Sequence, residues 1–182
     1  MKRTLLLMAL AGIIITAQAQ ENAFTISGGY AYANLEDSET NSNGWRINGL
    51  YEFVPMGGKL AHGISLGYIS TIAEEGDGVL ETYKLINMPI YYAPKYSFGK
   101  NNLNVFIKGA FGMHYSWYER DGTILLVKDS DFGFYGGAGA GIKYTIKEKF
   151  FLQAEYEWAY LSNALYMGGF MNSAMGGIGI MF

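Results

Sequence analysis

The feature that most constrains this chain is a repeated alternation of apolar residues with small or polar ones. In the clearest segment Val105, Ile107 and Phe111 share one face, and Asn104 and Lys108 share the other. Such alternation indicates β-strands, because successive side chains of a strand point to opposite faces. Eight segments show it, at residues 23–35, 44–53, 60–72, 81–94, 103–118, 132–145, 151–161 and 170–182. We therefore expect an all-β chain of eight strands.

The N-terminus has the pattern of an exported protein. Two basic residues open the chain, an apolar run covers residues 5–15, and Ala17 and Ala19 fit a small-residue cleavage site. A membrane anchor would need close to twenty apolar residues, and this run is shorter. We predict that residues 1–19 are a cleaved signal peptide and that residues 20–182 form one domain.

The rest of the chain favours a closed β-barrel in a membrane. No later segment has eighteen consecutive apolar residues, as a membrane-spanning helix would require. The other structure that satisfies all its backbone hydrogen bonds in a bilayer is a closed barrel with a lipid face and an inner face. Trp45, Trp117 and Trp158 lie near segment ends, where interfacial aromatic residues gather. The prediction is a transmembrane up-and-down antiparallel barrel of eight strands.

An even number of strands brings both termini to the periplasmic side, which assigns the connections. The expected extracellular loops are residues 36–43, 73–80, 119–131 and 162–169, and the expected periplasmic turns are residues 54–58, 95–102 and 146–149. The loops are acidic, whereas the turns carry lysines, Lys95 and Lys147 among them. The loop acids lack a calcium-loop spacing, so solvated loops are expected rather than cation sites, with no metal or cofactor.

Charge and composition narrow the partners further. Without Lys2 and Arg3 the chain has 11 basic and 16 acidic residues, a net charge of about −5, which disfavours nucleic acid. The chain has no cysteine, which excludes disulfides, thiolate metal sites and cysteine nucleophiles.

Four features carry a resemblance to a known family: the signal peptide, the segment 86–92, the glycine-rich segment 136–141 and the ending 178–182. Over about residues 22–182 the chain resembles the small outer-membrane β-barrel superfamily of the OmpA and OmpX transmembrane domains, also described as the porin family. The resemblance implies a Gram-negative cell outer membrane, with lipid and lipopolysaccharide around the barrel. It also implies that Phe182, with apolar residues at alternate preceding positions, is a signal to the outer-membrane insertion machinery.

Seven ionisable residues fall on the expected inner face. An eight-stranded barrel has an interior only wide enough for side chains, so charges placed there must pair. We expect a packed polar network in which Lys143 reaches Glu155 or Glu157 on the next strand; a narrow solute path and catalysis are the alternatives. The residues are Arg46, Glu52, Lys108, His114, Lys143, Glu155 and Glu157.

The sequence leaves several functions open. His114 and Ser116 are similar to the His-x-Ser element of outer-membrane lipid A deacylases, but alternation places both inside rather than on the lipid face, and Trp117 replaces the expected Asn. The leading hypothesis is a non-enzymatic barrel that serves envelope integrity, adhesion or surface binding through its acidic loops. The alternatives are a narrow porin-like channel, an acyl-ester hydrolase, and a soluble lipocalin-like barrel with an apolar ligand.

Overall fold

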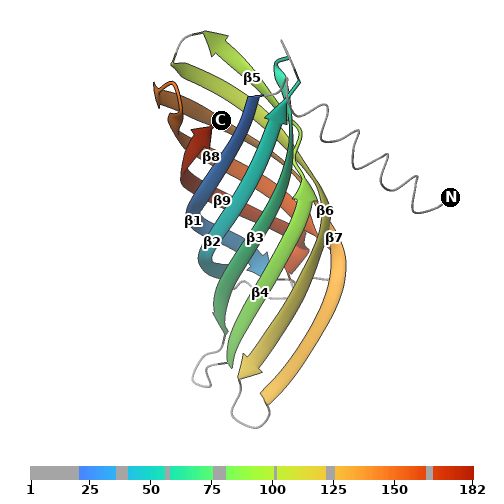
Figure 1. Cartoon of the computed structure of the whole chain (residues 1–182). Coiled ribbons are helices and arrows are strands. Elements are labelled where there is room, and N and C mark those ends of the chain that lie inside the picture. The colour runs from blue at the N-terminus through green and yellow to red at the C-terminus, as the bar shows by residue number, and fades with distance from the viewer. Residues whose placement is uncertain are drawn as a thin grey trace, which may run out of the picture.

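The protein folds as a closed antiparallel β-barrel. The computed structural model describes residues 21–35, 41–55, 58–75, 81–100, 102–121, 126–162 and 166–182, so the predicted signal peptide lies outside the described residues. Each barrel strand pairs with its neighbours in the chain, and β1 pairs with β9 to close the sheet (Figure 1). The strands are β1 (Glu21–Leu35), β2 (Asn41–Val54), β3 (Leu60–Glu75), β4 (Glu81–Tyr92), β5 (Lys95–Lys100), β6 (Leu103–Asp121), β7 (Leu126–Lys147), β8 (Phe150–Leu161) and β9 (Tyr166–Met181). The predicted all-β, eight-stranded architecture is confirmed.

The nine described strands occupy eight positions around the barrel, because β4 and β5 are two parts of one barrel strand that is interrupted by a break. Both pair with β3 on one side and β6 on the other. Pro94 has no N–H to donate, which interrupts the ladder. The pairing with β3 and β6 continues across the break, because Ala93 N donates to Gly63 O at 2.8 Å and Gly109 N donates to Pro94 O at 2.8 Å. The expected turn at residues 95–102 is therefore wrong over most of its length, where the chain forms β5.

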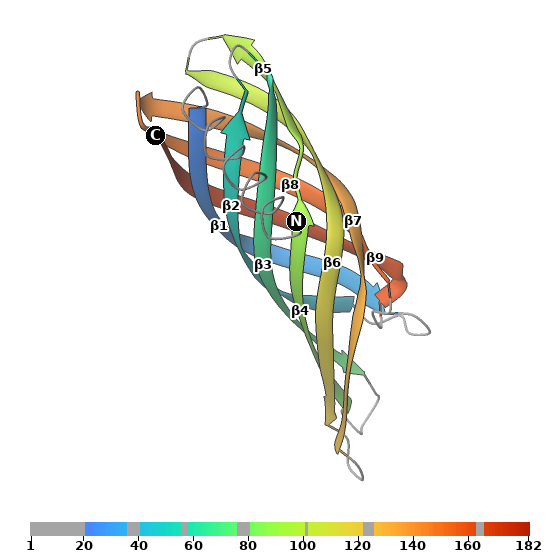
Figure 2. The same cartoon turned by 45° about the vertical axis from the view of Figure 1, so that its right-hand side comes forward.

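The strands β6 and β7 extend beyond the rest of the barrel. Their hairpin projects at the end away from the C-terminus (Figures 1 and 2). Their ladder runs out to Asp121 paired with Leu126, so most of the expected loop 119–131 is strand. Apolar alternation stops in this part of the sequence, so alternation does not predict these outer strand residues. The expected loops at 36–43 and 73–80 match the ends of the flanking strands to within a few residues.

Side chains on the outer wall are apolar, and those on the inner wall are small or polar. Along β8 every second side chain is buried, and the exposed set includes Leu152 and Tyr156. Within the described residues no helix is long and apolar enough to cross a membrane.

Hydrogen bonds between outward tyrosines and asparagines mark the two edges of the apolar wall. At one end the Tyr32 hydroxyl donates to Asn41 Oδ1 at 2.9 Å, and at the other the Tyr51 hydroxyl donates to Asn22 Oδ1 at 3.1 Å. Both Asn22 and Tyr32 lie on β1, ten positions apart, and a transmembrane β-strand needs about 9–11 residues. The wall between them fits the hydrocarbon core of a bilayer.

Candidate functional site: the polar core of the barrel

A buried ion pair between Arg46 and Glu157 crosses the lumen. Arg46 lies on β2 and Glu157 on β8, and the strands β1 and β9 separate them in the sheet. Arg46 Nη1 lies 2.6 Å from Glu157 Oε1, and both side chains are excluded from solvent. Charge-assisted hydrogen bonds of this kind are stronger than neutral ones. The pair joins two walls that share no backbone hydrogen bonds.

Lys108 is a second cation on the same carboxylate. It projects from β6, and its Nζ lies 2.7 Å from Glu157 Oε2 and also pairs with Glu155. In the ladder Lys108 stands opposite Gly139 of β7, and Gly139 stands opposite Glu157 of β8. Because Gly139 has no side chain, the lysine and the carboxylate meet across β7.

Two tyrosines complete the surroundings of Glu157. The Tyr135 hydroxyl donates to Glu157 Oε1, and the Tyr91 hydroxyl donates to Oε2 at 3.3 Å. Arg46 Nη2 in turn donates to the Tyr91 hydroxyl at 3.0 Å, and the two tyrosine rings stack with centroids 4.9 Å apart. Four side chains therefore converge on one buried carboxylate.

A separate ion pair lies nearer the end of the barrel that holds the C-terminus. Lys95 Nζ donates to Glu52 Oε2 at 2.6 Å, and both residues are buried. The same ammonium lies 4.8 Å from the ring centroid of Phe106, a cation–π contact. The rings of Phe106 and Phe151, both buried, fill the lumen on this side.

The expected contact from Lys143 to a glutamate needs correction. The ion pairs of Glu155 and Glu157 are with Lys108 and Arg46. Lys143 Nζ instead lies 4.2 Å from the ring centroid of Phe151 and donates to Met181 Sδ at 3.6 Å. The reason is register, because Lys143 stands opposite Gln153 in the ladder.

His114 lies inside the barrel, toward the end away from the C-terminus. It is fully buried, and its Nε2 lies 2.7 Å from the backbone oxygen of Ser162. A carbonyl oxygen only accepts, so Nε2 carries the proton. Ser116 Oγ donates to the Asp131 backbone oxygen at 3.4 Å. These two side chains of the His-x-Ser element thus bond to two different backbone carbonyls.

Phe182 closes the ladder between the two ends of the chain. Phe182 N donates to Asn22 O at 2.9 Å, and Asn22 N donates to Phe182 O at 3.1 Å. Its ring is exposed on the outer wall, 6.5 Å from the Tyr51 ring. Phe182 therefore lies at the edge of the apolar wall that Asn22 and Tyr51 mark.

Sequence reasoning misses three members of the polar core: Lys95, Tyr91 and Tyr135. Lys95 falls in an expected turn because it follows Pro94, although counting every second residue from Tyr91 onward places it inside. Tyrosine is typical of the interfacial belt, and this masks the role of the two inward tyrosines.

The core is balanced in charge. Among the described residues, three buried lysine and arginine cations face three buried carboxylates, and each belongs to an ion pair. In the same part of the chain no group of three His, Asp or Glu side chains is placed to hold a metal ion. Such an arrangement can connect strands across the lumen.

A closed eight-stranded barrel with an apolar outer wall and a paired, charged interior defines a transmembrane β-barrel protein of the outer-membrane type. The family model "Outer membrane protein beta-barrel domain" matches residues 5–173. The chain belongs to this family and is a protein of the bacterial outer membrane.

Solved structures with the same fold include three outer-membrane and surface proteins. Neisserial surface protein A has a TM-score of 0.62 and 11% identity over 88% of this chain and 97% of its own. Ail, the attachment invasion locus protein of Yersinia pestis, has a TM-score of 0.58 and 15% identity, over 89% of this chain and 98% of its own. A major outer membrane protein from Thermus thermophilus has a TM-score of 0.63 and 13% identity, over 90% of this chain and 100% of its own. A comparison with curated protein sequences finds no significant match.

Proposed function

We propose that this protein is a non-enzymatic surface-binding barrel, in which a packed lumen supports an extracellular end that contacts partners. The observation that carries the proposal is the projecting β6–β7 hairpin. The polar core supports a barrel that conducts no solute, because ion pairs and aromatic rings occupy its interior. Outer-membrane lipid and lipopolysaccharide are the surroundings that the apolar, aromatic outer wall fits.

The outer part of β7 forms an edge of the described ladder, beyond its pairing with β8. The β7–β8 ladder starts at Tyr135 paired with Leu161, while β7 itself begins at Leu126. Over residues 126–133 the described ladder therefore pairs β7 with β6 alone.

Two side chains near the end of this edge suit selective contact. Phe132 is 66% exposed and supplies an apolar anchor. The Phe132 N–H already donates to Asp131 Oδ1 at 2.7 Å, so contact at this position is through the ring rather than the backbone. The acidic residues of the extracellular loops favour a partner with a basic surface. The name of Ail refers to attachment, and its likeness in fold supports the same class of role.

Shortening the hairpin should abolish adherence. Deleting residues 119–121 together with 126–128 removes three paired positions and keeps the register of the rest. We expect cells that display this variant to adhere to immobilised lysozyme, a basic protein, no better than cells without the barrel. Adherence would be measured by counting bound cells, with serum albumin as the acidic comparison surface.

The matched control exchanges Glu119 and Lys128, which face each other in the ladder, and so keeps both length and net charge. Its adherence should equal that of the wild type. Equal adherence of the shortened variant would reject the hairpin as the binding element. A stable, ion-selective current through the wild type in planar bilayers would favour the channel alternative instead.

Phe182 is proposed to present the chain to the insertion machinery. Phe182→Ala keeps the backbone bonds to Asn22 but removes the terminal ring, so the folded fraction in the outer membrane should fall. The faster migration of the unboiled protein in gel electrophoresis measures that fraction. Phe98→Ala, which removes another exposed ring, is the control. Unchanged abundance of folded Phe182→Ala would remove this role.

A further inference from the structure

We infer that the outer wall binds one anionic phospholipid of the periplasmic leaflet. One acyl chain lies in an apolar groove on the strands β1, β9 and β8, and the phosphate lies beside Lys147 and Lys149. This inference concerns the membrane-facing wall and stands apart from the proposed surface binding at the extracellular end.

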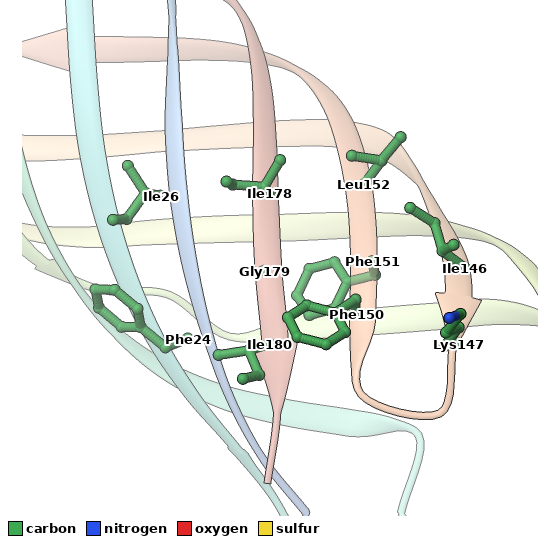
Figure 3. A pocket seen from close by; sticks show the side chains of 10 residues that line it. All are labelled: Phe24, Ile26, Ile146, Lys147, Phe150, Phe151, Leu152, Ile178, Gly179 and Ile180. Atoms are coloured by element: carbon green, nitrogen blue, oxygen red, sulfur yellow. The ribbon is translucent and has the colours of Figure 1, made fainter.

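The groove is a hollow of about 530 Å³ on the outer wall near the end of β9. Figure 3 shows Phe24 and Ile26 on one side of Ile178 and Ile180, with Leu152 and other residues of the β7–β8 hairpin on the other. Apart from Lys147 the lining consists of apolar residues and glycine. A hydrocarbon chain is the ligand that such a lining accepts without leaving a polar group unpaired.

On the side of the groove nearer the membrane centre, the outward positions of the wall carry little or no side chain. There the outward positions Gly28, Gly176 and Ala154 lie in one ladder row across β1, β9 and β8. A Cβ at Gly176 would meet no atom within 4 Å. The next row toward the periplasm, Ile26 with Ile178, has full side chains. A chain that enters the groove can therefore continue toward the membrane centre against nearly bare strands.

A β-bulge places Lys147 beside this groove. Lys143 and Thr145 belong to the inward set of β7, so simple alternation would also turn Lys147 inward. The register shifts between Thr145 and Lys147, and Lys147 stands opposite Phe150, an outward residue. Bulges re-aim side chains in this way. The lysine is exposed on the outer wall at the end of the groove.

The two lysines lie at the depth of a phospholipid headgroup. Met181 N donates to Lys149 O at 2.7 Å, which ties Lys149 to the end of β9. The next residue, Phe182, bonds to Asn22 at the periplasmic edge of the apolar wall. The groove therefore spans the acyl region just inside that edge, and the lysines lie at the edge itself.

The charge at this edge selects the headgroup. A second hollow, of about 500 Å³, is lined by Lys147, Glu148, Lys149 and Phe150, and it shares Lys147 and Phe150 with the groove. The side chains that line this second hollow, two lysines and one glutamate, carry one net positive charge. Phosphatidylglycerol brings a phosphate without a cation, whereas the ammonium of phosphatidylcholine would be repelled. The site should therefore prefer the anionic lipid.

Native mass spectrometry of the folded barrel tests this preference. The protein is released from detergent in the presence of equal amounts of phosphatidylglycerol and phosphatidylcholine with identical acyl chains. The wild type should retain one phosphatidylglycerol in preference. Retention should fall about fivefold for each lysine replaced in Lys147→Gln/Lys149→Gln. Lys59→Gln/Lys84→Gln, which removes two exposed lysines elsewhere, should behave as the wild type.

A third variant separates the groove from the headgroup site. Leu152 is exposed, so Leu152→Trp fills the groove without entering the barrel, and it should lower retention of both lipids. Only protein that migrates as the folded form is compared. Equal retention of both lipids by the wild type, equal losses in the two double-lysine variants, or full retention by Leu152→Trp would each overturn the site. A lipid-free dimer lost in Leu152→Trp would give the groove to a second copy and would also overturn it.

Discussion

Glu157→Gln should lower the free energy of unfolding by about 3–5 kcal/mol, because it leaves two buried cations without their shared carboxylate. Glutamine has nearly the same shape, so the loss reports charge rather than volume. Arg46 and Lys108 both lose an ion-pair partner, and two tyrosine hydroxyls lose a charged acceptor. Urea unfolding of the barrel in lipid vesicles measures the difference.

The control for this substitution is Glu148→Gln, at the exposed turn between β7 and β8, which should change stability by less than about 0.5 kcal/mol. Lys108→Met, which removes a buried ion-pair partner of Glu155 and Glu157, should likewise destabilise more than Lys147→Met, which removes an exposed lysine. Equal unfolding midpoints for the two glutamate variants would show that the core charges do not brace the barrel. A double variant with Arg46→Met should lose less than the sum of its single variants, because both act on one pair.

Gly29→Ala should prevent β1 and β9 from pairing at their present spacing. A Cβ at Gly29 would lie 2.7 Å from Met175 Cα and collide with the carbonyl of Ala174, and backbone atoms cannot move aside as a flexible side chain can. Overpacking of this kind costs about 1–3 kcal/mol. The folded fraction after refolding into vesicles, read from gel migration, should fall.

Gly176 supplies the matched control on the same pair of strands. An added Cβ there meets nothing within 4 Å, so Gly176→Ala should fold as the wild type does. A larger fall in the folded fraction for Gly176→Ala than for Gly29→Ala would contradict the close approach of β1 and β9 at Gly29.

Alternation is sufficient to predict the strand number, the closed barrel and which side of most strands faces lipid. It succeeds because a membrane wall imposes an apolar set on one face of every strand. It fails where the apolar set of residues ends, as in the outer part of the β6–β7 hairpin, which extends beyond the rest of the barrel. It also fails at Pro94, which reads as the start of a turn although neighbouring strands carry the ladder past it.

The core illustrates a different limit. Alternation places Arg46, Lys108, Glu155 and Glu157 on inner faces, where the structure has them buried. Which cation meets which carboxylate depends on how far each strand is shifted along its neighbour. Lys108 can reach Glu157 because position 139, which lies between them in the ladder, is a glycine without a side chain. Alternation alone predicts neither the register of neighbouring strands nor the contact between Lys108 and Glu157.

The seam between β1 and β9 sets an order on the way the barrel forms. Every other pairing joins barrel strands that follow one another in the chain, whereas this one pairs Ala23 with Met181. The loop closed by that contact spans nearly the whole domain, and such non-local contacts form slowly. Until β9 arrives, the growing sheet has two open edges whose unpaired amides and carbonyls are costly in hydrocarbon. Insertion and closure should therefore occur as one cooperative event, completed only after the C-terminal strand has entered the membrane.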